Sequence, residues 1–188
     1  MTTANKVDLE RATFAGGCFW CGETLFKRLN GVAQVVSGYA GASDKAPSYE
    51  QVCSGNSGFA EAVQIEFDPK VISFDKLLEV FWAVHDPTTL NRQGGDIGSQ
   101  YRSAIFYSSP AQKTAAEQSI SKLTDAGKFK DPIVTAVEPL VNFFPAEEYH
   151  RDFYDRNRTN GYCRLVIDPK IQKLYKNFGT DLKPETNA

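Results

Sequence analysis

Two cysteines three positions apart are the residues best suited to chemistry in this chain. They lie in residues 16–21, GGCFWC, between an apolar run and an amphipathic one. The pattern predicts a strand at residues 12–16 and a helix at residues 19–29, which puts Cys18 at a helix N-terminus. Unpaired N–H groups and the positive end of the helix dipole favour a thiolate there. We therefore expect Cys18 to be a nucleophile.

The Cys-x-x-Cys spacing also occurs in sites of a different kind. A zinc site would need two further ligands, and we expect no metal because the candidates occur singly: Cys53, Cys163, His85 and His150. A thioredoxin-like dithiol also places this spacing at a helix start, so a disulfide oxidoreductase is the nearer alternative. A cysteine can also be simply a small buried apolar residue.

A glutamate lies on the apolar face of the clearest strand pattern, residues 59–67. The other positions of that face are apolar: Phe59, Val63, Ile65 and Phe67. Because burial disfavours the charged form of a carboxyl group, Glu61 should be protonated there. A neutral carboxyl group near a nucleophile is what general acid catalysis requires. The alternative is that Glu61 lies at the mouth of the strand and points into water.

The composition is ordinary for a soluble globular protein. The chain has 188 residues, 41% of them apolar and 23% charged, with a formal net charge of −2. These values favour neither a nucleic-acid partner nor a membrane surface, and no apolar run reaches membrane-spanning length. Four cysteines are too few for a disulfide-stapled scaffold. We therefore expect a cytoplasmic protein with functional thiols.

Strand and helix patterns alternate irregularly along the chain, which favours an α+β fold. Expected strands cover residues 12–16, 32–39, 59–67, 100–107 and 134–137. Expected helices cover residues 19–29, 73–84, 110–127 and 168–178, with a helical turn at 146–154 and loops at 42–57 and 91–99. The first elements follow the order β-α-β-β-α-β, which predicts a two-layer sandwich with a ferredoxin-like core and C-terminal extensions.

The expected domain organisation is simple. Residues 1–10 should form a flexible arm, residues 11–178 a single catalytic domain and residues 179–188 a flexible tail. At this length one domain can bury a sizeable core. We expect the chain to be a monomer.

Six fragments in a fixed order add a more specific signal. They are residues 16–20 (GGCFW), 38–41 (GYAG), 49–53 (YEQVC), 58–63 (GFAEAV), 85–88 (HDPT) and 96–103 (DIGSQYRS). Together they resemble the A-type peptide methionine-sulfoxide reductases, which act on the S epimer. The resemblance runs from about residue 12 to residue 178. It implies thiol-dependent reduction of methionine-S-sulfoxide, free or in proteins, with no metal, flavin or nicotinamide.

The resemblance also implies roles for individual side chains. Cys18 would attack the sulfoxide sulfur, and Glu61 would protonate the sulfoxide oxygen. Tyr49 and Tyr101 match phenols that hydrogen-bond this oxygen. Asp96 matches a carboxylate that helps to position the substrate or a water molecule.

The aromatic residues beside the nucleophile match the family's binding site for the S-methyl group. Phe19 and Trp20 would hold this methyl group, and His150 matches a histidine near the pocket with a supporting role. Only one hand of the sulfoxide then puts the methyl group on the rings and the oxygen on the donors together. The resemblance therefore implies an epimer filter.

The resolution of the Cys18 sulfenic acid is where the chain departs from the common pattern. Many relatives carry resolving cysteines in a glycine-rich C-terminal tail, whereas the last ten residues here contain none. Cys163 resembles the first of those tail cysteines, and Cys21 lies one helical turn from Cys18. We hold these two equally as resolving candidates, with Cys53 third. An external dithiol such as thioredoxin would reduce the resulting disulfide.

Overall fold

A six-stranded mixed sheet forms the centre of the computed structural model, which describes residues 8–41 and 43–184. Its strands are β1 (Glu10–Gly16), β2 (Val32–Gly41), β3 (Ala60–Phe67), β6 (Ser103–Tyr107), β7 (Ala136–Pro139) and β8 (Asn142–Pro145). The strand order is β7-β6-β1-β3-β2-β8. Only the β6–β7 pair is parallel, and the other four pairs are antiparallel.

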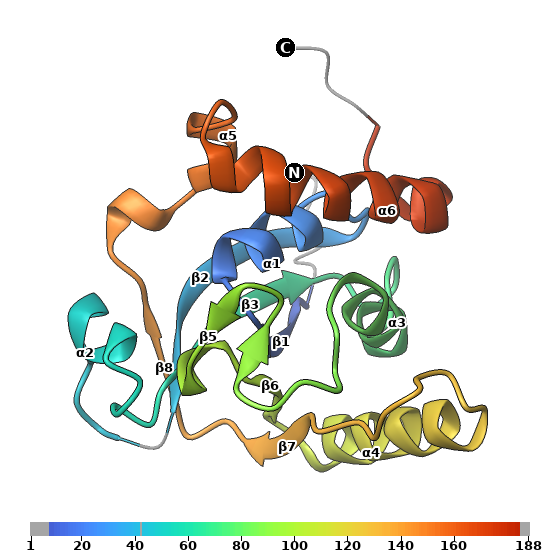
Figure 1. Ribbon diagram of the computed structural model, residues 1–188. Helices are drawn as coiled ribbons and strands as arrows, with labels where there is room; N and C mark the ends of the chain where they lie inside the picture. Colours follow the sequence, from blue (N-terminus) through green and yellow to red (C-terminus); the bar gives the residue numbers. More distant parts are fainter. Residues whose placement is uncertain (1–7, 42, 185–188) are drawn as a thin grey trace, which may run out of the picture.

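The described residues also form six α-helices, so the fold is α+β as predicted (Figure 1). They are α1 (Phe19–Phe26), α2 (Tyr49–Cys53), α3 (Phe74–Val84), α4 (Pro110–Asp125), α5 (Phe153–Arg156) and α6 (Asp168–Phe178). Short elements complete the described part: a hairpin of β4 (Arg92–Gln93) and β5 (Asp96–Ile97), 3-10 turns at Ser99–Tyr101, Glu148–His150 and Gly179–Asp181, and a π-helical turn at Cys163–Ile167. Helix α6 lies along α1 and also contacts α3.

The main core lies between the sheet and the helices. Phe14 of β1 packs against Phe26 and Phe81, with ring centroids 5.6 and 5.0 Å apart, and so joins β1 to α1 and α3. A second buried cluster consists mainly of alanines: Ala15, Ala40, Ala60, Ala62, Ala104 and Phe106. Small side chains let the later segments approach the sheet closely.

Several elements differ from the sequence prediction. Helix α1 ends at Phe26 rather than near residue 29. Helix α2 lies inside the expected loop at 42–57, because Ser48 and Gln51 form a capping box that starts a single helical turn. Residues 99–101 form a 3-10 turn where the start of a strand was predicted, so β6 begins only at Ser103.

The C-terminal third contains the largest differences. Strand β8 was not predicted and pairs with β2 in an antiparallel register. Gly38 permits this pairing, since a Cβ there would lie 2.4 Å from the Phe144 carbonyl oxygen. Residues 163–167 form a π-helical turn continuous with α6, where the sequence predicted no element.

The two ends of the chain also bear on the prediction. The expected arm at residues 1–10 lies mostly outside the described residues, and Glu10 already belongs to β1. Of the expected tail at 179–188, residues 185–188 lie outside the described part. The Asn30 N–H donates to the Asp181 carbonyl oxygen at 2.8 Å, and the Lys183 N–H donates to the Arg28 carbonyl oxygen at 2.8 Å. These bonds hold residues 181–183 against the end of α1.

Helices of the described residues are all too short or too polar to cross a membrane.

Candidate active site

The turn from β1 into α1 fixes the position of Cys18. Cys18 is the N-cap residue of α1. Gly17 before it has φ +92°, and a Cβ at Gly17 would lie 2.6 Å from Gln93 Cγ. Gln93 is itself held by two hydrogen bonds with the Asp86 backbone, at 3.0 and 3.1 Å. Only glycine meets both demands at position 17, so the turn holds Cys18 in one place.

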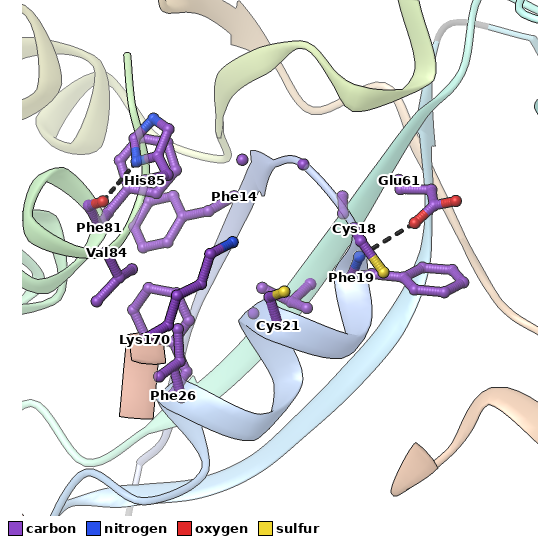
Figure 2. A pocket seen from close by; sticks show the side chains of 16 residues that line it. Phe14, Cys18, Phe19, Cys21, Phe26, Glu61, Phe81, Val84, His85 and Lys170 are labelled. Carbon is purple, nitrogen blue, oxygen red and sulfur yellow. Dashed lines mark hydrogen bonds between the residues drawn. The ribbon is translucent and has the colours of Figure 1, made fainter. Parts of the chain in front are cut away.

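Cys18 and Glu61 lie in the same pocket, as the sequence predicted (Figure 2). Cys18 is 8% exposed and Glu61 is 2% exposed. Glu61 comes from β3, where it is paired with Tyr39 of β2. Its Oε2 accepts a hydrogen bond of 3.1 Å from the N–H of Phe19, the residue next to Cys18. The expected burial of Glu61 on the apolar face of its strand is confirmed.

The Glu61 carboxyl group is neutral at pH 7. Burial raises its pKa to about 8, and the Phe19 N–H bond lowers it only in part. The nearby charges of Asp96 and Cys21 raise this pKa further. Glu61 can therefore donate a proton.

The thiols differ from the prediction. Burial raises the pKa of Cys18 above its ordinary value, and the hydrogen bond with Cys21 and the charge of Glu61 act in the same direction. The Cys18 side chain makes no capping bond to the helix N–H groups. The hydrogen bond from Cys18 lowers the pKa of Cys21 to about 6. Of the two thiols, Cys21 is therefore the one whose thiolate form the site favours.

Aromatic rings lie next to Cys18. Phe19 is buried and lies 5.9 Å from Tyr39 and 5.0 Å from His150 between ring centroids. Trp20 stacks on Phe153, with centroids 3.6 Å apart and planes 5° from parallel. Phe19 and Trp20 are thus brought together beside the nucleophile, as expected for a site that receives a small apolar group.

His150 has a defined protonation state. Trp20 Nε1–H donates to His150 Nδ1 at 3.1 Å, and indole can only donate, so the proton of a neutral imidazole is on Nε2. Burial lowers the pKa of His150, which keeps the ring neutral. Within the described residues His150 Nε2 has no hydrogen-bond partner, and Glu147 Oε2 lies 4.0 Å away. His150 therefore holds Trp20 in place and keeps one donor free.

Glu147 connects three parts of the site and was not predicted from the sequence. It accepts hydrogen bonds from the Tyr39 hydroxyl at 2.7 Å and from the Tyr49 N–H at 3.1 Å. The ring of Tyr49 lies 4.6 Å from that of His150. Glu147 thereby places Tyr49 of α2 beside the aromatic wall.

Asp96 and Tyr101 also reach the site, from the β5 hairpin and the following 3-10 turn. The Tyr162 hydroxyl donates to Asp96 Oδ2 at 2.7 Å, and Tyr162 is among the groups that lower the pKa of both Cys18 and Cys21. Burial raises the pKa of Tyr101, so its phenol is a donor, and charges on Glu61, Cys18 and Asp96 add to the shift. Tyr162 was not predicted from the sequence, where its one signal is its position before a cysteine.

The candidate resolving thiols have different environments. Cys21 lines the same pocket as Cys18. Cys163 is fully buried in the π-helical turn and is not among the pocket-lining residues. Cys53 is exposed at the end of α2. All four cysteines are free thiols.

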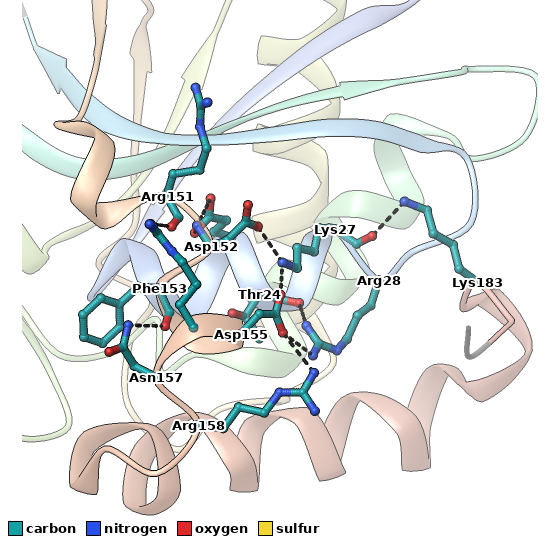
Figure 3. A network of polar contacts seen from close by, with 12 residues as sticks. Thr24, Lys27, Arg28, Arg151, Asp152, Phe153, Asp155, Asn157, Arg158 and Lys183 are labelled. Carbon is teal, nitrogen blue, oxygen red and sulfur yellow. Dashed lines mark hydrogen bonds and ion pairs between the residues drawn. The ribbon is translucent and has the colours of Figure 1, made fainter. Parts of the chain in front are cut away.

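A polar cluster holds the segment around α5 against α1 (Figure 3). Lys27 Nζ pairs with Asp152 at 2.7 Å and also with Asp155. Buried Glu23 accepts two hydrogen bonds from the Asp152 N–H, at 3.1 and 3.2 Å. We call Glu23, Lys27, Asp152 and Asp155 the α5 clamp. Because Phe153 follows Asp152 directly, the clamp sets the position of the ring on which Trp20 stacks.

The described residues contain no preformed metal site. Among residues 8–41 and 43–184, no group of three or more His, Cys, Asp or Glu is arranged to hold a metal ion.

Comparisons with known proteins agree with the site. The family model described as peptide methionine sulfoxide reductase matches residues 10–182. The chain is 55% identical over 178 residues to peptide methionine sulfoxide reductase MsrA of Leptospira borgpetersenii, covering 94% of this chain and 99% of that protein.

Two solved structures of Mxr1 from Saccharomyces cerevisiae are similar to it. The reduced form has a TM-score of 0.77 and 36% identity, covering 87% of this chain and 95% of that one. Mxr1 in complex with Trx2 has a TM-score of 0.56 and 28% identity, covering 81% and 92%. The chain therefore belongs to the A-type peptide methionine sulfoxide reductases, enzymes that reduce methionine sulfoxide.

Proposed function

We propose that this enzyme reduces methionine-S-sulfoxide, free or in proteins, with Cys18 as the nucleophile and Glu61 as the general acid. One observation carries the proposal: the neutral carboxyl group of Glu61 and the thiol of Cys18 are both buried in one pocket. The carboxyl group accepts a hydrogen bond from the N–H of Phe19, the residue that follows Cys18. Sulfoxide oxygen is a poor leaving group until it is protonated. A positioned acid typically contributes about 10²–10⁴-fold to such a step.

The proposed step is balanced in atoms and protons. The Cys18 sulfur attacks the sulfoxide sulfur while Glu61 gives its proton to the oxygen. The hydroxyl group then passes to Cys18 as a sulfenic acid, the substrate leaves as the thioether, and Glu61 recovers the proton that the thiol lost. If Glu61 gave its proton to the substrate oxygen and recovered none, its carboxylate would remain as an anion beside Cys18. Burial and the nearby negative charges disfavour that anion.

The remaining side chains are proposed to orient the sulfoxide. Tyr49 and Tyr101 would donate to its oxygen, and Asp96 would hold Tyr162 and a substrate-bound water. Phe19 and Trp20 would receive the methyl group, with His150 fixing the indole through the Trp20 Nε1–H bond. This division of apolar and donor groups supports selection of the S epimer.

The sulfenic acid is proposed to be resolved by Cys21 in the first instance. Cys21 shares the pocket with Cys18 and lies one helical turn away, where its backbone N–H donates to the Cys18 carbonyl oxygen at 3.1 Å. Cys163 is the alternative, and its complete burial would require the π-helical turn to open. Thioredoxin or a similar dithiol is the proposed reductant, a role supported by the solved complex of Mxr1 with Trx2.

The proposal extends to the organisation of the chain. We propose a cytoplasmic monomer with one catalytic domain at residues 11–178. We also propose a ferredoxin-like core, since β6-β1-β3-β2 is the antiparallel order of a β-α-β-β-α-β unit. Sedimentation of the purified chain tests the monomer.

Separated sulfoxide epimers test the proposed function. Purified protein receives S- or R-methionine sulfoxide with dithiothreitol, beside the Cys18→Ser variant. We expect methionine from the S form only, and none with Cys18→Ser. Turnover of the R form alone, or full activity of Cys18→Ser, would overturn the proposal.

A further inference from the structure

Lys170 places an ammonium group in a mostly apolar pocket. It belongs to the first turn of α6, and its side chain extends toward Cys21 (Figure 2). Most of the surrounding pocket is lined by apolar side chains: Phe14, Leu25, Phe26, Val63, Phe81 and Val84. An ammonium group is costly in such surroundings unless an anion or acceptor compensates it. Lys170 is half-buried, so an acceptor inside the pocket would compensate the part of its side chain that is away from water.

The described residues offer Lys170 no carboxylate within ion-pair distance. All the salt bridges between residues 8 and 184 involve other cations. Cys21 lines the same pocket, and the charge of Lys170 is among the causes that lower the pKa of Cys21. Lys170 is also the sole lysine or arginine among the residues that line the pocket in the described part of the chain.

The other titratable groups that face Cys21 supply no positive charge. Cys18 lies on the same helix, Glu61 on β3, Tyr162 before the π-helical turn and Cys163 within it. His85, at the end of α3, lines the same pocket, but burial lowers its pKa to about 4 and leaves it neutral at pH 7. Lys170 is thus the cation that can compensate a Cys21 thiolate.

We propose that Lys170 is the positioning residue that holds Cys21 as a thiolate and thereby makes Cys21 the resolving nucleophile. The inference rests on the proposed function, in which Cys18 becomes a sulfenic acid. In the resolving step the Cys21 sulfur attacks the Cys18 sulfur, a sulfur–sulfur bond forms and the sulfur–oxygen bond breaks. Cys21 is oxidised, Cys18 is reduced, and the departing hydroxide takes a proton from solvent to leave as water.

The contrast with Cys163 supports this assignment. The charge and hydrogen bond of Lys170 both lower the pKa of Cys21. Burial raises the pKa of Cys163, where the charges of Asp168 and Cys21 add to the effect and no cation counters them. The thiolate is the more reactive form of a cysteine, so the cation favours Cys21 over Cys163.

Alkylation of Cys21 tests the role of Lys170 without any sulfoxide. In a Cys18→Ser background, iodoacetamide labelling of the Cys21 peptide is followed by mass spectrometry against pH. Lys170→Met should raise the labelling midpoint by about one unit, which lowers the rate near pH 7 about tenfold. Lys170→Arg should restore most of the rate. Lys176→Met, on the exposed part of the same helix, is the matched control and should leave the midpoint unchanged.

A second readout follows resolution in the presence of Cys18. After one turnover with S-methionine sulfoxide and no reductant, dimedone should label more Cys18 sulfenic acid in Lys170→Met than in Lys176→Met. An unchanged Cys21 midpoint in Lys170→Met, or equal shifts in both lysine variants, would overturn the inference. The labelling needs no sulfoxide, so that failure would leave the proposed function standing, whereas the epimer assay tests that function alone.

Discussion

Helix α1 has ionisable groups near both ends, and the two sets differ in their access to water. At its start, Glu61 is 2% exposed beside Cys18. Near its end, the α5 clamp pairs Lys27, whose side chain is 27% exposed, with Asp152, whose side chain is 51% exposed. The clamp has more opposite charges, yet its pairs are of the kind typically worth about 0–1 kcal/mol each. Exclusion of water, rather than the number of charges, gives the pocket its chemistry.

Glu23 shows that depth alone does not set the protonation state. Glu23 and Glu61 are almost equally buried, at 3% and 2% exposure. Burial raises the pKa of Glu23 to about 6 and that of Glu61 to about 8. Both carboxyl groups accept a backbone N–H and lie near other acids, but Glu23 also lies near the Lys27 charge, which lowers its pKa, whereas no cation lowers that of Glu61. The same residue type is thus ionised at one end of α1 and neutral at the other.

The largest effect is expected from Glu61→Gln. The amide keeps the shape of the side chain but cannot give up a proton, so the rate of methionine formation should fall about 10²–10⁴-fold. The measurement is a single-turnover assay with S-methionine sulfoxide. Glu23→Gln is the matched control, because it alters an equally buried glutamate outside the pocket, and its loss should be much smaller. Equal losses of rate in Glu61→Gln and Glu23→Gln would contradict the proposed difference between the two glutamates.

The next effect separates the two candidate resolving thiols. After one turnover without reductant, Cys21→Ser should retain Cys18 as a sulfenic acid, because the thiol that shares its pocket is gone. Cys163→Ser should form a Cys18–Cys21 disulfide to nearly the wild-type extent. Peptide mass spectrometry distinguishes the products. A Cys18–Cys163 disulfide in the wild type would assign the resolving role to the buried thiol instead.

A third effect is the pH dependence of stability. The unfolded chain releases the Glu61 proton near pH 4.5, while the folded chain keeps it to about pH 8, the pKa of the buried carboxyl. Between these values the unfolded state binds fewer protons, so the free energy of unfolding should fall with rising pH by at most ~1.4 kcal/mol per unit.

Urea unfolding near pH 5 and pH 7.5 measures this slope. Glu61→Gln has no carboxyl group to titrate, so its unfolding free energy should fall less than that of the wild type over the same interval. Parallel slopes for the two proteins would show that Glu61 is not held neutral by folding.

The smallest effect is expected at the exposed end of the helix. Lys27→Met removes the cation that pairs with Asp152 and Asp155 but keeps the aliphatic stem. The free energy of unfolding should fall by about 1 kcal/mol or less, and the loss should shrink in high salt because the pairs are partly exposed. Urea unfolding at low and high salt is the test. A loss several-fold larger and independent of salt would mean that the clamp acts as a buried pair.

The sequence alone predicted the parts of the site that depend on local pattern. The alternation in residues 59–67 placed Glu61 on a buried face, and the glycines before Cys18 indicated a sharp strand-to-helix turn. The thiolate on Cys18 was wrong for the free protein, because the helix-terminus argument omitted both burial and the hydrogen bond with Cys21. That bond depends on side-chain orientation, which the spacing of two cysteines does not determine.

Other features could not be read from local sequence because distant segments create them. Glu147 joins Tyr39 and Tyr49 across about a hundred residues, and Lys170 reaches Cys21 only because α6 packs along α1. The capping box of Ser48 and Gln51 was readable, but its glycine- and serine-rich surroundings favoured a loop. Strand β8 is four residues long and ends in proline, so it has little strand pattern of its own.

The central claim is that folding holds the Glu61 carboxyl group neutral beside Cys18 at pH 7. Infrared difference spectroscopy between the wild type and Glu61→Gln tests it directly, through the carbonyl band of a protonated carboxylic acid. We predict this band in the wild type at pH 7, absent from the variant and lost as the pH rises above about 8. A wild-type spectrum with only the carboxylate bands at pH 7 would contradict it.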